Sequence, residues 1–262
     1  MKTILAALTL GCAAVLAVVQ PAAAAPAEKP TIVLVHGAFA DASSWNGVVH
    51  ILQHDGYHTI AVANPLRSVA GDGAYVHALL GTIKTPVVLV GHSYGGMVIS
   101  NAANDQANVK ALVFVAAFAP EAGESAGSLD GKFPGALVGA ALAPPVPLPG
   151  GGNDLYVLQD KFHDAFAPDL PKAAASVAAA EQRPITDVAF GGPAAGASAW
   201  QTIPSWFIYG DHDTAIPPQA HAFMAARAHA RATVVVKGAS HVVMISHPDA
   251  VAKMIEEAAA AH

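Results

Sequence analysis

Short apolar runs alternate with longer mixed segments along most of this chain. A strand that is buried on both faces of a parallel sheet is apolar at nearly every position, instead of alternating between apolar and polar residues, and these runs have that pattern. The intervening and following segments predict helices at residues 45–52, 72–80, 218–228 and 248–260. This alternation predicts an α/β fold, with a mostly parallel six-stranded sheet and helices on both faces. The six predicted strands are residues 31–35, 58–62, 86–90, 109–117, 205–209 and 233–236.

The alternation stops between about residues 121 and 200. This segment holds a Pro/Gly-rich stretch at 143–152, two helix candidates on either side of Pro168, and no clear strand pattern. Long connections of this kind are usually lids or binding loops. The strand pattern resumes afterwards, so we interpret 121–200 as a helical lid insertion within one domain spanning 26–262. A disordered linker between two domains is the alternative.

The first 25 residues have the pattern of a secretory signal peptide. Lys2 precedes a nearly continuous apolar stretch, and the small residues at 22–25 offer a cleavage site near Ala24 or Ala25. We therefore expect export to the periplasm or the extracellular space, with no stable membrane partner after cleavage. A retained anchor helix and lipidation at Cys12 are the alternatives.

Composition narrows the range of functions. Cys12 is the single cysteine, so a chain cleaved at the predicted site has neither a disulfide nor a thiol nucleophile. The net charge is −6 and the chain has no basic run, which argues against a nucleic-acid partner. The oligomeric state is not readable from the sequence.

Ser93 is the candidate nucleophile. It lies in Gly91-His92-Ser93-Tyr94-Gly95, directly after a predicted buried strand and before an apolar segment. This G-x-S-x-G pattern between a strand and a helix predicts a nucleophile elbow, in which a strained turn presents the serine hydroxyl above the sheet.

A serine nucleophile needs a base and an acid, and both candidates follow late strands. Asp213 follows the fifth predicted strand and His241 the sixth, in the chain order serine, acid, histidine. The histidine takes the serine proton and the carboxylate orients the imidazole. We prefer Asp213 to Asp211, which we expect to bond within its own turn. The adjacent His212 does not make a metal site with these aspartates, because three consecutive side chains do not converge on one ion.

An oxyanion requires two backbone donors. One predicted donor is the amide of Tyr94, directly after the nucleophile, and the other is the amide of Ala38 in the loop after the first strand. Gly37 allows a sharp exit from that strand, and we expect His36 to hold the loop by side-chain hydrogen bonds. Phe39 is a candidate substrate contact.

These residues resemble the α/β-hydrolase superfamily, and more narrowly its methyl esterase and hydroxynitrile lyase branch, which includes the salicylate-binding esterase. The resemblance runs from about Thr31 to the C-terminus and is weak in the middle of the insertion. It implies Ser93, His241 and Asp213 as a catalytic triad, with the Ala38 and Tyr94 amides as oxyanion donors. The motifs that carry it are residues 36–39, 91–97, 114–120, 213–217 and 237–241.

Two departures from the lyase pattern indicate ester hydrolysis. The lyases carry threonine at the position of Gly37 and lysine at that of Val242. The expected function is therefore that of an exported serine esterase, without cofactor or metal, acting on small to medium apolar or aromatic esters. Alternatives are other chemistry on the same fold, such as C–C hydrolysis or perhydrolysis, and slow-turnover ligand binding. Aromatic candidates for the substrate pocket, any of which could instead be core, are Phe39, Phe118, Phe133, Tyr156 and Phe162.

Overall fold

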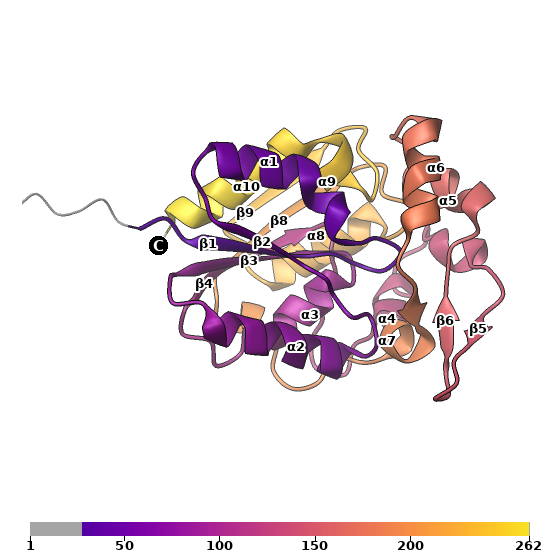
Figure 1. Cartoon of the computed structure of the whole chain (residues 1–262), viewed down its shortest axis with the longest axis horizontal. Coiled ribbons are helices and arrows are strands. Elements are labelled where there is room, and N and C mark those ends of the chain that lie inside the picture. Colours follow the sequence, from indigo (N-terminus) through magenta and orange to yellow (C-terminus); the bar gives the residue numbers. More distant parts are fainter. Residues whose placement is uncertain (1–27, 262) are drawn as a thin grey trace, which may run out of the picture.

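A computed structural model describes residues 28–261. The predicted signal peptide, residues 1–25, lies outside the described residues. The described chain forms a six-stranded sheet between two helical layers, with the insertion at one end of the sheet (Figure 1).

All six predicted strands form one sheet in which every neighbouring pair is parallel. The strand order β2-β1-β3-β4-β8-β9 confirms the predicted fold. The fourth strand ends two residues before its predicted end, because Ala116 leaves the extended conformation with φ of +42°. The strands are β1 Thr31–Val35, β2 Thr59–Val62, β3 Val87–His92, β4 Val109–Val115, β8 Ser205–Gly210 and β9 Ala232–Val236.

Helices cover both faces of this sheet. Helices α1 and α10 pack together on one face, and α2 and α3 on the other (Figure 1). Asp41 caps the first helical segment, where its side chain accepts the Ser43 backbone N–H, and that segment begins as a 3-10 turn. These helical elements are η1 Ala42–Trp45, α1 Asn46–His54, α2 Val69–Thr82, α3 Gly95–Ala102, α8 Pro218–Arg227, α9 Val243–Ser246 and α10 Pro248–Ala260.

The insertion contains two helices around Pro168, as predicted, but it also forms a three-stranded antiparallel sheet, β5-β6-β7. The expectation of no sheet in this segment was wrong. These strands are two or three residues long, which is too short to give a readable alternation of side chains. The elements are α4 Ala126–Asp130, η2 Val138–Ala141, β5 Val146–Pro147, β6 Asn153–Leu155, α5 Gln159–Phe166, α6 Lys172–Glu181, β7 Ile185–Thr186, α7 Asp187–Gly191 and η3 Ala199–Gln201.

Charged side chains fasten the insertion to the rest of the molecule. Arg67 follows β2, and its guanidinium donates to Asp154 at 2.6 Å and to the Pro184 carbonyl at 2.9 Å. Arg227 of α8 forms an ion pair with Glu124 at 2.8 Å. Bidentate or repeated arginine contacts of this kind fix geometry as well as adding energy. The insertion is therefore held near its start, at Glu124, and further along, at Asp154 and Pro184.

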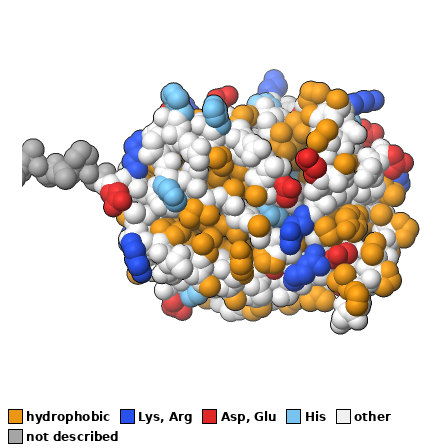
Figure 2. Space-filling view, in the orientation of Figure 1, with side chains coloured by type: hydrophobic (Ala, Val, Ile, Leu, Met, Phe, Trp, Pro, Cys, Tyr) orange, Lys and Arg blue, Asp and Glu red, His pale blue; other side chains and the backbone are white. Residues whose placement is uncertain are grey.

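Aromatic side chains fill much of the core. Phe114 and Phe207, from neighbouring strands, stack with ring centroids 4.6 Å apart. On the face shown in Figure 2, acidic and basic side chains are interspersed with hydrophobic ones. Between residues 28 and 261, helices long and apolar enough to cross a bilayer are absent.

Candidate active site

Ser93 lies in the sharp turn between β3 and α3. Its φ of +53° is in the left-handed region, which costs a non-glycine residue free energy. Hydrogen bonds on both sides hold it there: its N–H donates to the Ala116 carbonyl at 3.1 Å, and its carbonyl accepts from the N–H groups of Gly96 at 2.9 Å and Phe118 at 3.2 Å. The end of β4 therefore fixes the backbone of the candidate nucleophile.

Glycines are required where other backbone segments approach this turn. A Cβ on Gly95 would lie 2.4 Å from the Val35 carbonyl oxygen. A Cβ on Gly37 would lie 2.5 Å from the Ser93 Cβ. The loop after β1 therefore passes directly against the serine side chain, which is where an oxyanion donor must lie.

The structure brings Asp213 and His241 together. His241 Nδ1–H donates to Asp213 Oδ2 at 2.9 Å, and both side chains are buried. Because Nδ1 carries the proton, Nε2 of a neutral His241 is free to accept one. Nε2 is buried without a hydrogen-bond partner among the described residues. A free basic nitrogen of this kind is what proton transfer from a hydroxyl requires.

The same carboxylate binds a second histidine, which the sequence analysis missed. His221 Nε2–H of α8 donates to Asp213 Oδ2 at 3.0 Å, and its ring stacks on Tyr209. Asp213 Oδ1 accepts the N–H groups of Ala215 and Ile216, both at 2.9 Å. Burial alone would raise the pKa of Asp213, but His241, His221 and the hydrogen bonds hold it well below its usual range. Asp213 is therefore a fixed carboxylate at neutral pH.

Two aromatic rings position the imidazole of His241. The ring of His92 lies 4.7 Å from it and that of Phe166 lies 4.9 Å from it, centroid to centroid. His92 Nε2–H donates to the His241 carbonyl at 3.0 Å, and burial lowers the pKa of His92 well below its usual value. A neutral His92 therefore supports His241 without adding a charge beside it.

Ser93 and His241 line one cavity of about 230 Å³. Ala38, Tyr94 and Phe39 line it too, so the cavity brings together every site residue predicted from sequence except Asp213, which lies behind His241. The remaining walls come from Phe118 in the segment after β4, from the insertion and from the loop after β8. This cavity is the candidate active site.

The Ala38 and Tyr94 amides are available as donors. Among the described residues, neither N–H donates to a backbone or side-chain acceptor. The Tyr94 side chain points elsewhere: its hydroxyl donates to Asp72 at 2.8 Å, and burial together with this carboxylate raises its pKa. Two free amides beside a serine are the arrangement that stabilises an oxyanion.

His36 holds the loop that carries Ala38. Its Nδ1–H donates to the Gly37 carbonyl at 2.9 Å, and its Nε2 accepts the Asn64 N–H at 3.1 Å. Both ring nitrogens are therefore occupied, and burial lowers the pKa of His36. Phe39, which follows Ala38, has a φ of +58°. Its N–H donates to the Arg183 carbonyl of the insertion at 3.1 Å.

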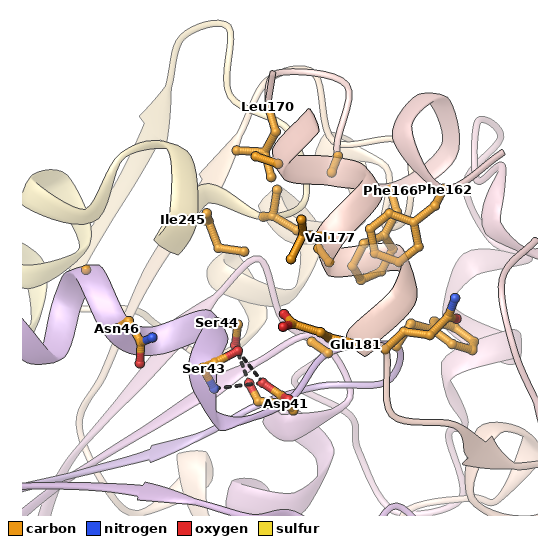
Figure 3. A pocket seen from close by; sticks show the side chains of 18 residues that line it. Asp41, Ser43, Ser44, Asn46, Phe162, Phe166, Leu170, Val177, Glu181 and Ile245 are labelled. Carbon is orange, nitrogen blue, oxygen red and sulfur yellow. Dashed lines mark hydrogen bonds between the residues drawn. The ribbon is translucent and has the colours of Figure 1, made fainter. Parts of the chain in front are cut away.

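Phe39 and Phe166 separate the candidate active site from a second cavity. Their rings meet edge to face, with centroids 6.1 Å apart, and both line each cavity. The second cavity, about 200 Å³, lies between η1, α1 and the helices of the insertion (Figure 3). Of the other aromatic candidates, Phe118 lines the first cavity and Phe162 the second, whereas Phe133 packs on Phe223. Tyr156 is not among the lining residues of either cavity.

The turn after β8 separates the two candidate aspartates. Asp211 Oδ1 accepts the N–H of Gly238 at 2.6 Å, so this side chain bridges to the next loop. The expectation that Asp211 bonds within its own turn was wrong. His212 is exposed. Within residues 28–261, histidines, cysteines and acidic residues form no group of three or more that could hold a metal ion.

Asp169 of the insertion supports the loop that carries His241. Its carboxylate accepts the Ser240 N–H at 3.0 Å and also the Ser240 hydroxyl. This residue and His221 have no sequence motif, because their contacts depend on how distant elements pack. Asp130, also in the insertion, lines the candidate active site and was missed for the same reason.

Comparisons with known proteins identify the family of the chain. The sequence model of the alpha/beta hydrolase family matches residues 32–254. A protein described as alpha/beta hydrolase nvfD, from Aspergillus novofumigatus, is 28% identical over 252 residues, covering 88% of this chain and 97% of that protein. A carbendazim hydrolyzing esterase from Nocardioides is 34% identical over 108 residues, covering 35% of this chain and 43% of the esterase.

Solved structures share the fold. Polyneuridine aldehyde esterase matches with a TM-score of 0.74 at 20% identity, covering 88% of this chain and 99% of that one. A methylesterase from Arabidopsis matches with a TM-score of 0.72 at 15% identity, covering 87% and 98%. The shared fold extends over nearly the whole length of both proteins.

Gly37→Ala should impair both activity and stability. The added Cβ would lie 2.5 Å from the Ser93 Cβ and 2.8 Å from the His92 carbonyl oxygen, so the loop or the serine must shift. We expect a loss of about 1–3 kcal/mol in the free energy of unfolding and a larger proportional loss of ester turnover. Gly81→Ala is the matched control, since its Cβ meets open space in α2. Equal behaviour of the two variants would contradict the close approach.

His221→Phe should lower stability in a pH-dependent way. The lowered pKa of Asp213 stabilises the fold above the unfolded carboxyl pKa of about 3.9, and this contribution is lost as the pH falls below that value. Removing one imidazole donor should cost about 1.5–3 kcal/mol at pH 7 and less at pH 3. Urea unfolding at both pH values measures this, with the exposed His212→Phe as control. An equal loss in the free energy of unfolding at both pH values would contradict a hydrogen bond from His221 to an ionised Asp213.

Proposed function

The chain belongs to the alpha/beta hydrolase family, and we propose that it is a serine esterase. The observation that carries this proposal is the buried His241–Asp213 hydrogen bond, at 2.9 Å, beside a serine held at a positive φ in the same cavity. The family match and the esterase names of its relatives support the proposal.

In the proposed reaction, Ser93 Oγ attacks the ester carbonyl while His241 Nε2 takes its proton. Asp213 keeps the imidazole in the required tautomer and stabilises the imidazolium that forms. His241 then returns the proton to the leaving alkoxide, which departs as the alcohol. Water attacks the acyl-enzyme with His241 again as base, and the acid product leaves.

The negative charge on the substrate oxygen is stabilised by the Ala38 and Tyr94 amides. Donors of this kind typically contribute about 3 kcal/mol each to transition-state stabilisation. The amide of Tyr94 also lies at the N-terminal end of α3, where the helix dipole favours a developing negative charge.

Small to medium apolar or aromatic esters are the proposed substrates. The cavity volume of about 230 Å³ limits substrate size. The walls of this cavity are aromatic and aliphatic, with side chains from Phe39, Phe118, Phe166, Phe190, Val138 and Ile216. Burial of such a surface against an apolar substrate supplies about 25 cal/mol for each Å² removed from water.

Ser93→Ala should abolish hydrolysis of a p-nitrophenyl acyl ester. Loss of a triad nucleophile lowers kcat by about a million-fold in a well-characterised serine protease. We expect the Ser93→Ala protein to fold as stably as the parent. The control is Ser246→Ala, which should keep its activity because the Ser246 hydroxyl bonds only to the neighbouring His247 in the described structure. Turnover retained by Ser93→Ala would contradict the assignment of the nucleophile.

We also propose that the protein is exported. The support is the sequence pattern of residues 1–25, which combines a basic start, an apolar stretch and a small-residue cleavage site. Expression of the full chain in a bacterium should give a protein outside the cytoplasm whose N-terminus begins near residue 25. Intact mass measurement decides this, and a chain that keeps Lys2 would contradict cleavage.

A further inference from the structure

Asp130 is an acidic side chain in the wall of an otherwise mainly apolar cavity. It is the last residue of α4, and the apolar residues that line the same cavity include Ala126, Val138 and Ile216. The other polar side chains that line the cavity belong to Ser93, Tyr94 and His241. Ser93 and His241 have proposed roles in the reaction, and the Tyr94 hydroxyl is bound to Asp72. Asp130 is thus the polar side chain in this wall that the proposed mechanism does not use.

The carboxylate of Asp130 has no structural partner. Neither of its oxygens accepts a hydrogen bond from the described residues, and Oδ1 is fully buried. The nearby cation Lys132 pairs with Glu124 instead. Asp130 ends helix α4, where the unpaired backbone groups are carbonyls, and an ionised carboxylate cannot donate to them, so it has no capping role there. Asp130 as a whole is half-buried, and a buried acceptor atom without a donor destabilises the folded protein.

The electrostatic surroundings of Asp130 reflect this cost. Burial raises its pKa to about 7, with His241 acting to lower it and the charge of Asp213 to raise it further. The carboxyl group would therefore be stabilised by a hydrogen-bond donor that enters the cavity. Buried polar groups that destabilise the free protein are typical of binding sites.

We propose that Asp130 determines substrate specificity by accepting a hydrogen bond from a hydroxyl group on the ester, remote from the carbonyl that Ser93 attacks. This inference rests on the proposed esterase function. A hydroxyl offers one donor, which matches the one unpartnered carboxylate in this wall. An ammonium group would have to leave water as a full charge and enter a mainly apolar cavity, and a carboxylate ligand would be repelled by Asp130.

The test compares chain-matched esters. Methyl 6-hydroxyhexanoate and methyl heptanoate have nearly the same length and differ in their terminal hydroxyl or methyl group. At pH 8 the Asp130 carboxyl, with a pKa of about 7, is mostly ionised. A hydrogen bond to a charged group contributes about 1.5–3 kcal/mol, so we expect kcat/KM at this pH to favour the hydroxy ester by about 10- to 150-fold. In Asp130→Leu this preference should disappear while hydrolysis of methyl heptanoate is kept or improved. The control is Asp164→Asn, which removes a highly exposed carboxylate of the insertion and should keep the preference for the hydroxy ester.

Three kinetic results would overturn the inference. One is an equal preference in the parent protein and Asp130→Leu. Another is a stronger preference for the matched 6-amino ester, which would indicate a cationic substrate. The third is loss of all hydrolysis in a folded Asp130→Leu protein, which would place Asp130 in the catalytic machinery.

Binding separates this inference from the proposed function. Ser93→Ala and Ser93→Ala/Asp130→Leu can be titrated with both esters by calorimetry, whether or not the parent protein hydrolyses them. Tighter binding of the hydroxy ester that depends on Asp130 supports the inference even if esterase activity fails. Equal binding of the two esters by both variants overturns it.

Thermal stability distinguishes a binding role from a structural one. The folded-state pKa of Asp130 lies above its unfolded value, so its unfavourable contribution grows as the pH rises from about 4 to 7. His241 and Asp213 are the ionisable groups that act on it most strongly. Asp130→Leu should therefore melt above the parent protein at pH 8, with a smaller difference at pH 5. A lower Tm for the variant at pH 8 would show a structural role and overturn the inference.

Discussion

The backbone of Ser93 is the constraint on which the site depends. A φ of +53° is costly for serine, and four hydrogen-bonding partners at the end of β4 and the start of α3 hold it in place. The turn leaves so little space that the loop after β1 passes at a distance only Gly37 permits. That close approach brings the free amide of Ala38 into the same cavity as the serine. The positions of the nucleophile and of the candidate oxyanion donors are therefore consequences of one strained turn.

Most of the fold could be predicted because its strands are long, apolar and buried on both faces. The run 31–35 was located with its observed bounds, and all six strands are parallel as expected. Two features could not be predicted. β4 ends where Ala116 turns to bond Ser93, which is a tertiary requirement with no local signal. The strands β5, β6 and β7 contain two or three residues each, too few for any periodicity.

The candidate site divides in the same way. Ser93, Asp213 and His241 follow strands whose carboxyl ends share one edge of the sheet, so their order along the chain indicated that they lie together. His221, Asp169 and Asp130 reach the site from a helix and from the insertion, and their sequence surroundings are ordinary. The insertion supports the His241 loop through Asp169, binds the Phe39 amide through Arg183, and supplies a carboxylate to the cavity. The insertion is thus part of the candidate site.

Covalent labelling can show directly whether Ser93 is an activated nucleophile. A fluorophosphonate reacts with an activated serine and leaves a stable adduct, which intact mass and peptide mapping can locate. We expect one adduct, on Ser93, whose rate of formation falls sharply when His241 is replaced by alanine. An unlabelled protein, or an adduct on another residue, would contradict it.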